Sequence, residues 1–135
     1  MKPTEDALLA LRANTSPYKG TTGVRRLRNA LRYSIAGVLA ACRHEDAFRV
    51  ELALAAVLVP VAFAMPVTGV GKALMVLPVL LVLIVELMNS AIEAVTDRVS
   101  LECHELAKRA KDMGSAAVMV SLVAVPVTWL LVLFG

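Results

Sequence analysis

Aromatic residues and cysteines are both scarce in this chain of 135 residues. Phe, Trp and Tyr together make up 4% of it, and its two cysteines, Cys42 and Cys103, do not form a CxxC motif. Nucleic-acid surfaces combine basic side chains with aromatic rings on which bases stack, so this composition argues against a role in binding RNA or DNA. Neither the cysteines nor the two histidines have the spacing of zinc ligands. We predict two free thiols, no zinc and no nucleic-acid partner.

The motifs that mark soluble phosphate-binding and cofactor-binding enzymes are also missing. The segment Gly69-Val70-Gly71-Lys72-Ala73 is similar to a phosphate loop, but that loop needs a glycine five residues before its Gly-Lys pair and a serine or threonine after it. Pro66 and Ala73 occupy those two positions. A protein-kinase signature, a nucleophile elbow and a dinucleotide fingerprint are absent as well. The sequence therefore indicates none of these enzyme classes.

Apolar residues, by contrast, are abundant. They make up 59% of the chain, with a mean hydropathy of +0.73, against about 45–50% apolar residues in soluble globular proteins. Three stretches match the roughly 20 residues that cross a bilayer, at about 52–71, 73–92 and 115–134. The prolines Pro60, Pro66, Pro78 and Pro126 lie within or beside these stretches, and we expect them to kink the helices without breaking them. The sequence predicts an all-α membrane protein with three transmembrane helices.

Basic residues are unevenly distributed along the chain. Of the 14 Lys and Arg residues, only Lys72 lies outside residues 1–49 and 98–111. Cytoplasmic loops carry an excess of Lys and Arg, so we predict a cytoplasmic N-terminus and a C-terminus on the opposite side. Residues 1–22 contain Pro3, Pro17 and Gly20 and are predicted to be a mobile leader. From Gly23 to Cys42, apolar residues recur at helical spacing opposite several arginines, which predicts an amphipathic helix at the membrane surface.

Polar residues recur at regular intervals near the end of the second predicted span and just after it. Offsets of 3, 7 and 11 from Glu86 place Asn89, Glu93 and Asp97 on the same helix face. Counted from Ala73, Glu86 lies about 20 Å into a hydrocarbon core about 30 Å thick, and Glu93 lies about 10 Å further along. Ionisable groups at such depths are costly and usually functional. We refer to these four residues as the polar ladder.

The polar ladder can support phosphoryl transfer. An ionised carboxylate among apolar side chains is unfavourable, which suits Glu86 to accept a proton, with Asn89 holding it in place. Glu93, together with Glu45 if the two segments pack together, offers the oxygen ligands that Mg²⁺ prefers. Phosphoryl transfer requires little beyond such positioning and charge neutralisation. The charges of residues 43–51 can equally be anchors at the membrane surface.

Other roles for the polar ladder remain open at this point. Its acids can form a structural network with Arg98, Lys108 or one another, because polar residues in membrane bundles hydrogen-bond between helices. Glu86 can also be the proton carrier of a small proton-coupled transporter, and a structural membrane subunit is a third class. Periodicity excludes none of them.

Two long segments resemble the prokaryotic diacylglycerol kinase family. They are Glu86-x-x-Asn89-Ser90-Ala91-Ile92-Glu93-Ala94-Val95-x-Asp97-Arg98 and His104-Glu105-Leu106-Ala107-x-x-Ala110-Lys111-Asp112-Met113-Gly114-Ser115-Ala116-Ala117-Val118, and the resemblance continues upstream through Tyr33-Ser34, Glu45 and Ala47-Phe48-Arg49-x-Glu51. It covers about residues 23–135. Members are multi-pass kinases of the bacterial inner membrane that transfer the γ-phosphate of ATP to diacylglycerol, giving phosphatidic acid. The resemblance therefore implies a homotrimeric bundle with active sites between protomers, and it favours a kinase over a transporter.

The resemblance also implies roles for individual residues. Glu86 matches the general base, Asn89 its supporting neighbour, and Glu45 and Glu93 the acids that bind Mg²⁺. The positions that contact ATP are Arg26, Tyr33, Glu45, Glu93, Glu102, Cys103, His104, Lys111 and Asp112, and those that line the lipid substrate are Glu51, Lys72, Glu86 and Ser115. Two departures affect local contacts, since Cys103 stands where members often carry Tyr and Ile35 where a Trp often follows the Tyr-Ser pair. A related branch phosphorylates undecaprenol, so that lipid is an alternative substrate.

Overall fold

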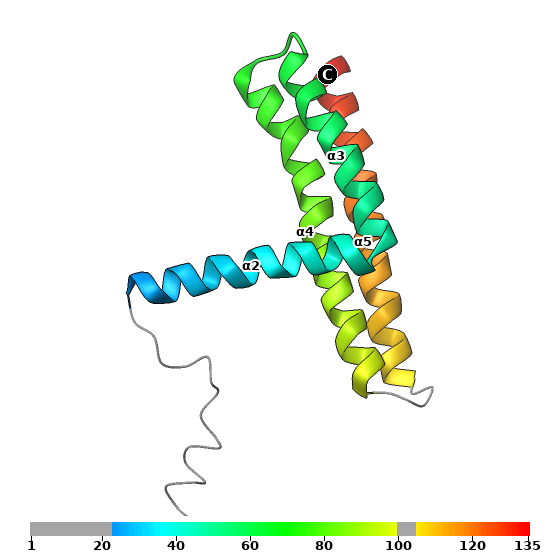
Figure 1. Ribbon diagram of the computed structural model, residues 1–135. Helices are drawn as coiled ribbons and strands as arrows, with labels where there is room; N and C mark the ends of the chain where they lie inside the picture. Colours follow the sequence, from blue (N-terminus) through cyan, green and yellow to red (C-terminus); the bar gives the residue numbers. More distant parts are fainter. Residues whose placement is uncertain (1–22, 100–104) are drawn as a thin grey trace, which may run out of the picture. The chain divides into compact units, whose positions relative to one another are not determined.

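The computed structural model of the protein describes residues 23–99 and 105–135, and all regular structure in these residues is α-helical (Figure 1). The helices are α2 (Val24–His44), α3 (Asp46–Ala64), α4 (Gly69–Val99) and α5 (Glu105–Phe134). Of these, α3, α4 and α5 are long and apolar enough to cross a membrane. The predicted all-α membrane fold with three spans after an amphipathic helix is confirmed. The predicted leader, residues 1–22, lies outside the described residues.

By its internal contacts the chain divides into two units, one ending at Gly37 and the other running from Val38 to Gly135. The described part of the first unit is the beginning of α2. Its apolar residues Val24, Leu27, Leu31 and Ile35 are all more than half exposed, and they recur at helical spacing opposite arginines. Such an uncovered apolar stripe suits a helix that lies on a bilayer surface.

In the second unit, α4 is the central helix, because both α3 and α5 pack against it. Figure 1 shows α5 running back alongside α4, so that the C-terminus lies at the same end as the turn between α3 and α4. Met75, Val79 and Val82 of α4 are buried together with small residues of α3, among them Ala55 and Ala62. Small side chains allow close approach of membrane helices where lipid provides no hydrophobic driving force. Most large apolar residues on the other faces are exposed, as expected for surfaces that meet lipid or another protein chain.

The first two membrane helices have bounds that differ from the spans expected from hydropathy. Helix α3 begins at Asp46 and ends at Ala64, where the expectation was about 52–71, and residues 65–68 form a turn. Met65 leaves the helical conformation, with φ −66° and ψ 142°, because the residue before a proline avoids the α region. Thr68 immediately precedes α4, and its hydroxyl accepts a hydrogen bond from the backbone N–H of Gly71 at 3.1 Å. The bound expected from hydropathy at about residue 71 is therefore too late for the end of α3.

Helix α4 extends well beyond the apolar stretch at 73–92. Its 31 residues correspond to a length of about 46 Å, which exceeds the roughly 30 Å of a hydrocarbon core. Pro78 lies inside it without ending it. In the turn before Pro78, the carbonyl of Met75 accepts a hydrogen bond from the indole Nε1 of Trp129 on α5, at 2.9 Å. The whole polar ladder therefore lies on one continuous helix.

Candidate functional site

The polar ladder passes from the interior of the second unit to its surface. Glu86 is 4% exposed and Asn89 is 9% exposed, whereas Glu93 is half-buried and Asp97 is exposed. The amide Nδ2 of Asn89 donates a hydrogen bond to Oε1 of Glu93 at 3.3 Å. The buried carboxylate of Glu86 is thus followed, one turn along the helix, by an amide that is hydrogen-bonded to a second carboxylate nearer the helix end.

Three further carboxylates are close enough to Glu86 to interact with it electrostatically. Its side chain is repelled by those of Glu93 and Glu45, and Glu51 on α3 is in turn repelled by Glu86. Glu45 is the N-cap residue of α3 and is half-buried, and its side chain makes no capping hydrogen bond. Like charges in a shared, poorly solvated site are unfavourable unless protons or cations compensate them. The fold therefore brings together Glu45, Glu51, Glu86 and Glu93, which the sequence motifs singled out from three separate segments.

The donor set of Glu45 and Glu93 fits Mg²⁺ bound together with a nucleotide. Mg²⁺ prefers oxygen ligands and is usually held by one or two carboxylates, with phosphate oxygens and water completing its coordination. Within residues 23–99 and 105–135, no group of three or more His, Cys, Asp and Glu side chains could form a metal site by itself. A site of two protein carboxylates matches the partial coordination that a magnesium–phosphate complex requires.

Glu51 lines a pocket of about 160 Å³. The pocket is otherwise lined by apolar side chains of α3, α4 and α5, which are Leu54, Ala55, Leu58, Val79, Val82, Leu122, Val125 and Pro126. Glu51 is 8% exposed, and among the described residues its Oε2 atom has no hydrogen-bond partner. A buried acceptor without a partner is costly, and a hydroxyl group is the kind of donor that would relieve this cost. The pocket therefore combines a polar acceptor with apolar walls.

Two more buried oxygens, the Oδ1 of Asn89 and the Oγ of Ser90, have no hydrogen-bond partner within residues 23–99 and 105–135, and both residues lie about one helical turn from Glu86. The backbone of α5 comes close to the Asn89 side chain at Gly114. A Cβ atom placed on Gly114 would lie 3.3 Å from Cγ of Asn89 and nearer still to its Oδ1. Only glycine leaves room for the Asn89 amide at this point. Sequence reasoning assigned no role to Ser90 or Gly114, although both stand inside the family motifs.

At the outer end of the polar ladder, Asp97 pairs with Lys111 of α5. The Lys111 ammonium donates a hydrogen bond to Oδ1 of Asp97 at 3.0 Å and also interacts electrostatically with Glu93. Asp112 and Ser115, which follow on α5, are exposed. Lys111 therefore lies within electrostatic reach of Glu93 as well as of Asp97.

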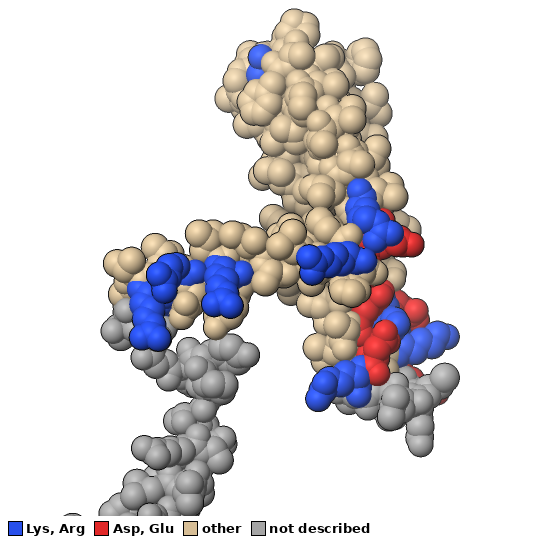
Figure 2. Space-filling view, in the orientation of Figure 1, with Lys and Arg blue, Asp and Glu red and all other residues tan. Residues whose placement is uncertain are grey.

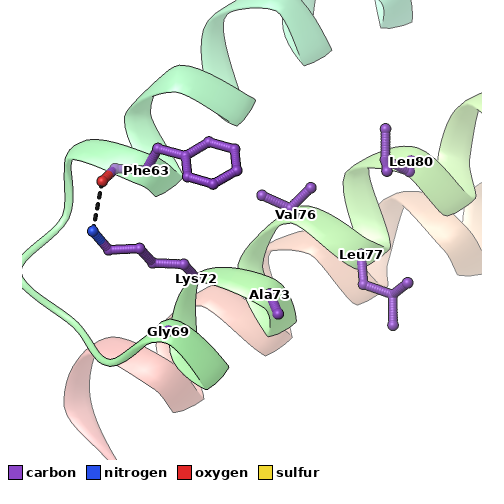
Figure 3. Close-up of a pocket in the computed structure, with 7 residues that line it drawn as sticks. All are labelled: Phe63, Gly69, Lys72, Ala73, Val76, Leu77 and Leu80. Carbon is purple, nitrogen blue, oxygen red and sulfur yellow. Dashed lines mark hydrogen bonds between the residues drawn. The ribbon is translucent and has the colours of Figure 1, made fainter.

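The remaining predicted site residues fall into three groups. Lys72 is at the opposite end of α4, about 21 Å along the helix axis from Glu86, and its ammonium donates to the carbonyl oxygen of Phe63 at 2.8 Å. Figure 3 shows it beside an apolar pocket of about 350 Å³. Arg26 and Tyr33 belong to the first unit, and residues 102–104, the predicted nucleotide contacts Glu102, Cys103 and His104, lie outside the described residues.

Charge is distributed over the second unit in the way that the polar ladder predicts. In Figure 2, acidic and basic side chains gather at one end of the three-helix unit, whereas the remainder of its visible surface is almost entirely uncharged. This segregation is typical of a membrane domain whose charged residues lie at one bilayer surface.

Comparison with known proteins finds one matching family model and several similar proteins. The family model described as prokaryotic diacylglycerol kinase matches residues 32–133. A protein named diacylglycerol kinase from Pseudomonas aeruginosa is 58% identical over 120 residues, which cover 89% of this chain and 98% of that protein. One of the same name from Haemophilus influenzae is 46% identical over 114 residues, covering 84% and 97%, and one from Escherichia coli K12 is 45% identical over 115 residues, covering 85% and 94%.

Proposed function

This chain belongs to the prokaryotic diacylglycerol kinase family, and we propose that its Glu86 is the general base that activates the lipid hydroxyl for attack on ATP. The protein is a diacylglycerol kinase embedded in the bacterial inner membrane. The observation that carries the proposal is the position of Glu86, which is almost fully buried between Glu51 on the apolar side and the Asn89–Glu93 hydrogen bond on the polar side. A base at this place can meet a lipid hydroxyl and a nucleotide together.

The lipid approaches from the side of Glu51. The pocket beside it is walled by apolar side chains of all three membrane helices, which suits the acyl part of a diacylglycerol. The Oε2 of Glu51, which has no partner in the part of the chain that the structure describes, accepts a hydrogen bond from the glycerol head group, so the reacting hydroxyl is oriented toward Glu86. Ser115 and Lys72 are proposed to contact other parts of the lipid, Lys72 at the far end of α4.

The chemical step is a direct transfer. As the hydroxyl oxygen of diacylglycerol attacks the γ-phosphorus, its proton moves to the carboxylate of Glu86. The new oxygen–phosphorus bond forms as the bond between the γ-phosphorus and the β–γ bridging oxygen breaks, and ADP leaves with that oxygen. The products are phosphatidic acid, ADP and a protonated Glu86, which returns its proton to water. Asn89 holds Glu93 in place through its hydrogen bond, and Asn89 lies one helical turn from Glu86 on the same face.

The donor side is formed by charged residues near the ends of α3 and α4. Glu45 and Glu93 are the proposed ligands of Mg²⁺, which when bound neutralises phosphate charge. Lys111, within electrostatic reach of Glu93, contacts the phosphates directly. Asp112 and the residues Arg26, Tyr33, Glu102, Cys103 and His104 are proposed to contact the rest of ATP.

We also propose that the enzyme is a homotrimer with active sites shared between protomers, a cytoplasmic N-terminus and a C-terminus on the opposite side. The largely exposed apolar surface of α5 is compatible with this assembly, because it offers area for both lipid and a second copy. The positively charged first unit and the basic residues after α4 support the orientation.

The test is transfer of radiolabelled γ-phosphate from ATP to diacylglycerol in detergent micelles. Glu86→Gln removes the base while preserving size, and turnover should fall by about two to four orders of magnitude. Glu5→Gln, a charge removal in the N-terminal segment, is the matched control and should retain full activity. Wild-type turnover in Glu86→Gln would remove this residue from the mechanism. Undecaprenol, offered alongside diacylglycerol, determines the acceptor, because the preferred lipid is the one with the higher kcat/KM.

A further inference from the structure

The ion pair between Asp97 and Lys111 connects α4 to α5 at the outer end of the polar ladder. The residues are 14 positions apart in the sequence, and the Nζ–Oδ1 distance is 3.0 Å. The Lys111 side chain is 40% exposed and that of Asp97 is 67% exposed. Exposed ion pairs contribute little to folding stability. The significance of this pair therefore lies in where it holds the ammonium group.

The Lys111 ammonium lies between two carboxylates of the same helix. It is hydrogen-bonded to Asp97 and interacts at longer range with Glu93, one turn earlier on α4. Within the part of the chain that the structure describes, Glu93 forms no ion pair, and its Oε1 accepts a hydrogen bond from Asn89. The lysine is thus held next to Glu93 without occupying its carboxylate.

We propose that Asp97 is a positioning residue that directs Lys111 toward the phosphates of ATP and keeps it from pairing with Glu93. This inference rests on the proposed function, in which Glu93 binds Mg²⁺ and Lys111 meets phosphate. An ammonium group has three N–H donors, so the one engaged by Asp97 leaves two for phosphate oxygens. When Asp97 loses its charge, the nearest remaining carboxylate for Lys111 is Glu93, and an ion pair there competes with Mg²⁺.

The central experiment is the kinetics of Asp97→Asn, which preserves the size of the side chain and removes its charge. The KM for Mg-ATP should rise about fivefold, equivalent to about 1 kcal/mol, and the Mg²⁺ concentration for half-maximal activity should rise with it. The turnover number and the KM for diacylglycerol should stay near wild type. Asp97→Glu restores the carboxylate and should restore most of the ATP affinity. An unchanged KM for Mg-ATP in Asp97→Asn overturns the inference.

Matched variants separate this inference from a general effect of surface charge. Asp46 forms an exposed ion pair with Arg49 within α3, so Asp46→Asn is the control and should leave the KM for Mg-ATP unchanged. In the wild type, rising ionic strength should screen the exposed pair and move the KM toward that of Asp97→Asn. A lower melting temperature and lower turnover in Asp97→Asn, without a change in KM, would indicate a structural role and contradict positioning.

A variant of Lys111 itself distinguishes failure of this inference from failure of the proposed function. If Lys111→Met binds Mg-ATP as tightly as wild type, the proposed phosphate contact of Lys111 is wrong. If Lys111→Met weakens binding but Asp97→Asn does not, only the positioning role fails. The double variant should have the same KM as Lys111→Met alone, because Asp97 acts through Lys111. Additive effects in the double variant would show that Asp97 acts by another route.

Discussion

Replacing Gly114 with alanine tests whether the close approach of α5 to Asn89 sets the geometry of the site. The added Cβ would lie 3.3 Å from Cγ of Asn89 and closer still to its Oδ1. The Asn89 side chain is buried and is hydrogen-bonded to Glu93, so it cannot simply turn toward solvent. Either the amide rotates and loses Glu93, or α4 and α5 move apart.

Both outcomes lower the stability of the folded protein, and the size of the loss can be estimated. Adding a methyl group to a packed interior typically costs about 1–3 kcal/mol, and losing the hydrogen bond to Glu93 costs about 1 kcal/mol. We therefore expect Gly114→Ala to destabilise the protein by about 1–3 kcal/mol. Turnover should fall as well, because the amide that is hydrogen-bonded to Glu93 is displaced.

The assay combines thermal unfolding in detergent with γ-phosphate transfer to diacylglycerol. Gly37→Ala is the matched control, because a Cβ on Gly37 meets nothing within 4 Å and alanine favours a helix by about 1 kcal/mol over glycine. Asn89→Ala removes the obstructing amide, so adding Gly114→Ala to it should have little further effect on stability. If Gly114→Ala has the same unfolding temperature and the same turnover number as the wild type, the steric argument is refuted.

Two further substitutions test the metal site and the helix contact. Glu93→Gln replaces a carboxylate with a weaker metal ligand and should raise the Mg²⁺ concentration needed for half-maximal activity, whereas the Asp46→Asn control should not; an unchanged Mg²⁺ dependence would count against Glu93 as a ligand. Trp129→Phe removes the hydrogen bond to the Met75 carbonyl and should lower stability by about 1–3 kcal/mol with the KM for Mg-ATP unchanged. Equal unfolding temperatures for Trp129→Phe and the wild type would show that this bond contributes nothing.

The helical membrane architecture could be predicted because it follows from local properties of the chain. Apolar stretches of about 20 residues have few stable conformations other than a membrane helix, and the 3.6-residue period places Glu86, Asn89, Glu93 and Asp97 on one face wherever that helix forms. The residues at which the helices begin and end were harder to predict from the sequence. Hydropathy continues through residues 65–68, and only the turn before Pro66 and the cap at Thr68 end α3 and begin α4.

Contacts between helices were beyond sequence reasoning. Nothing in the spacing of Gly114 shows that it lies against Asn89, and nothing pairs Asp97 with Lys111 rather than with Arg98 on its own helix. The family resemblance assigned both Lys72 and Glu86 to the lipid substrate, and the structure places Lys72 at the far end of α4, where its ammonium donates a hydrogen bond to the Phe63 carbonyl. A motif records which residues occur together in sequence, and it carries no distance between them.

The amino-acid sequence by itself determined that the protein spans a membrane with three helices, and that one of them carries a face of acids and an amide, because hydrophobic length and helical period are properties of single segments. Tertiary structure alone decided which of those groups meet. Packing of α3 and α5 on α4 places Glu45 and Glu51 within electrostatic reach of Glu86, leaves room at Gly114 for Asn89, and pairs Lys111 with Asp97. Such contacts depend on the relative placement of several helices, and no single segment encodes that placement.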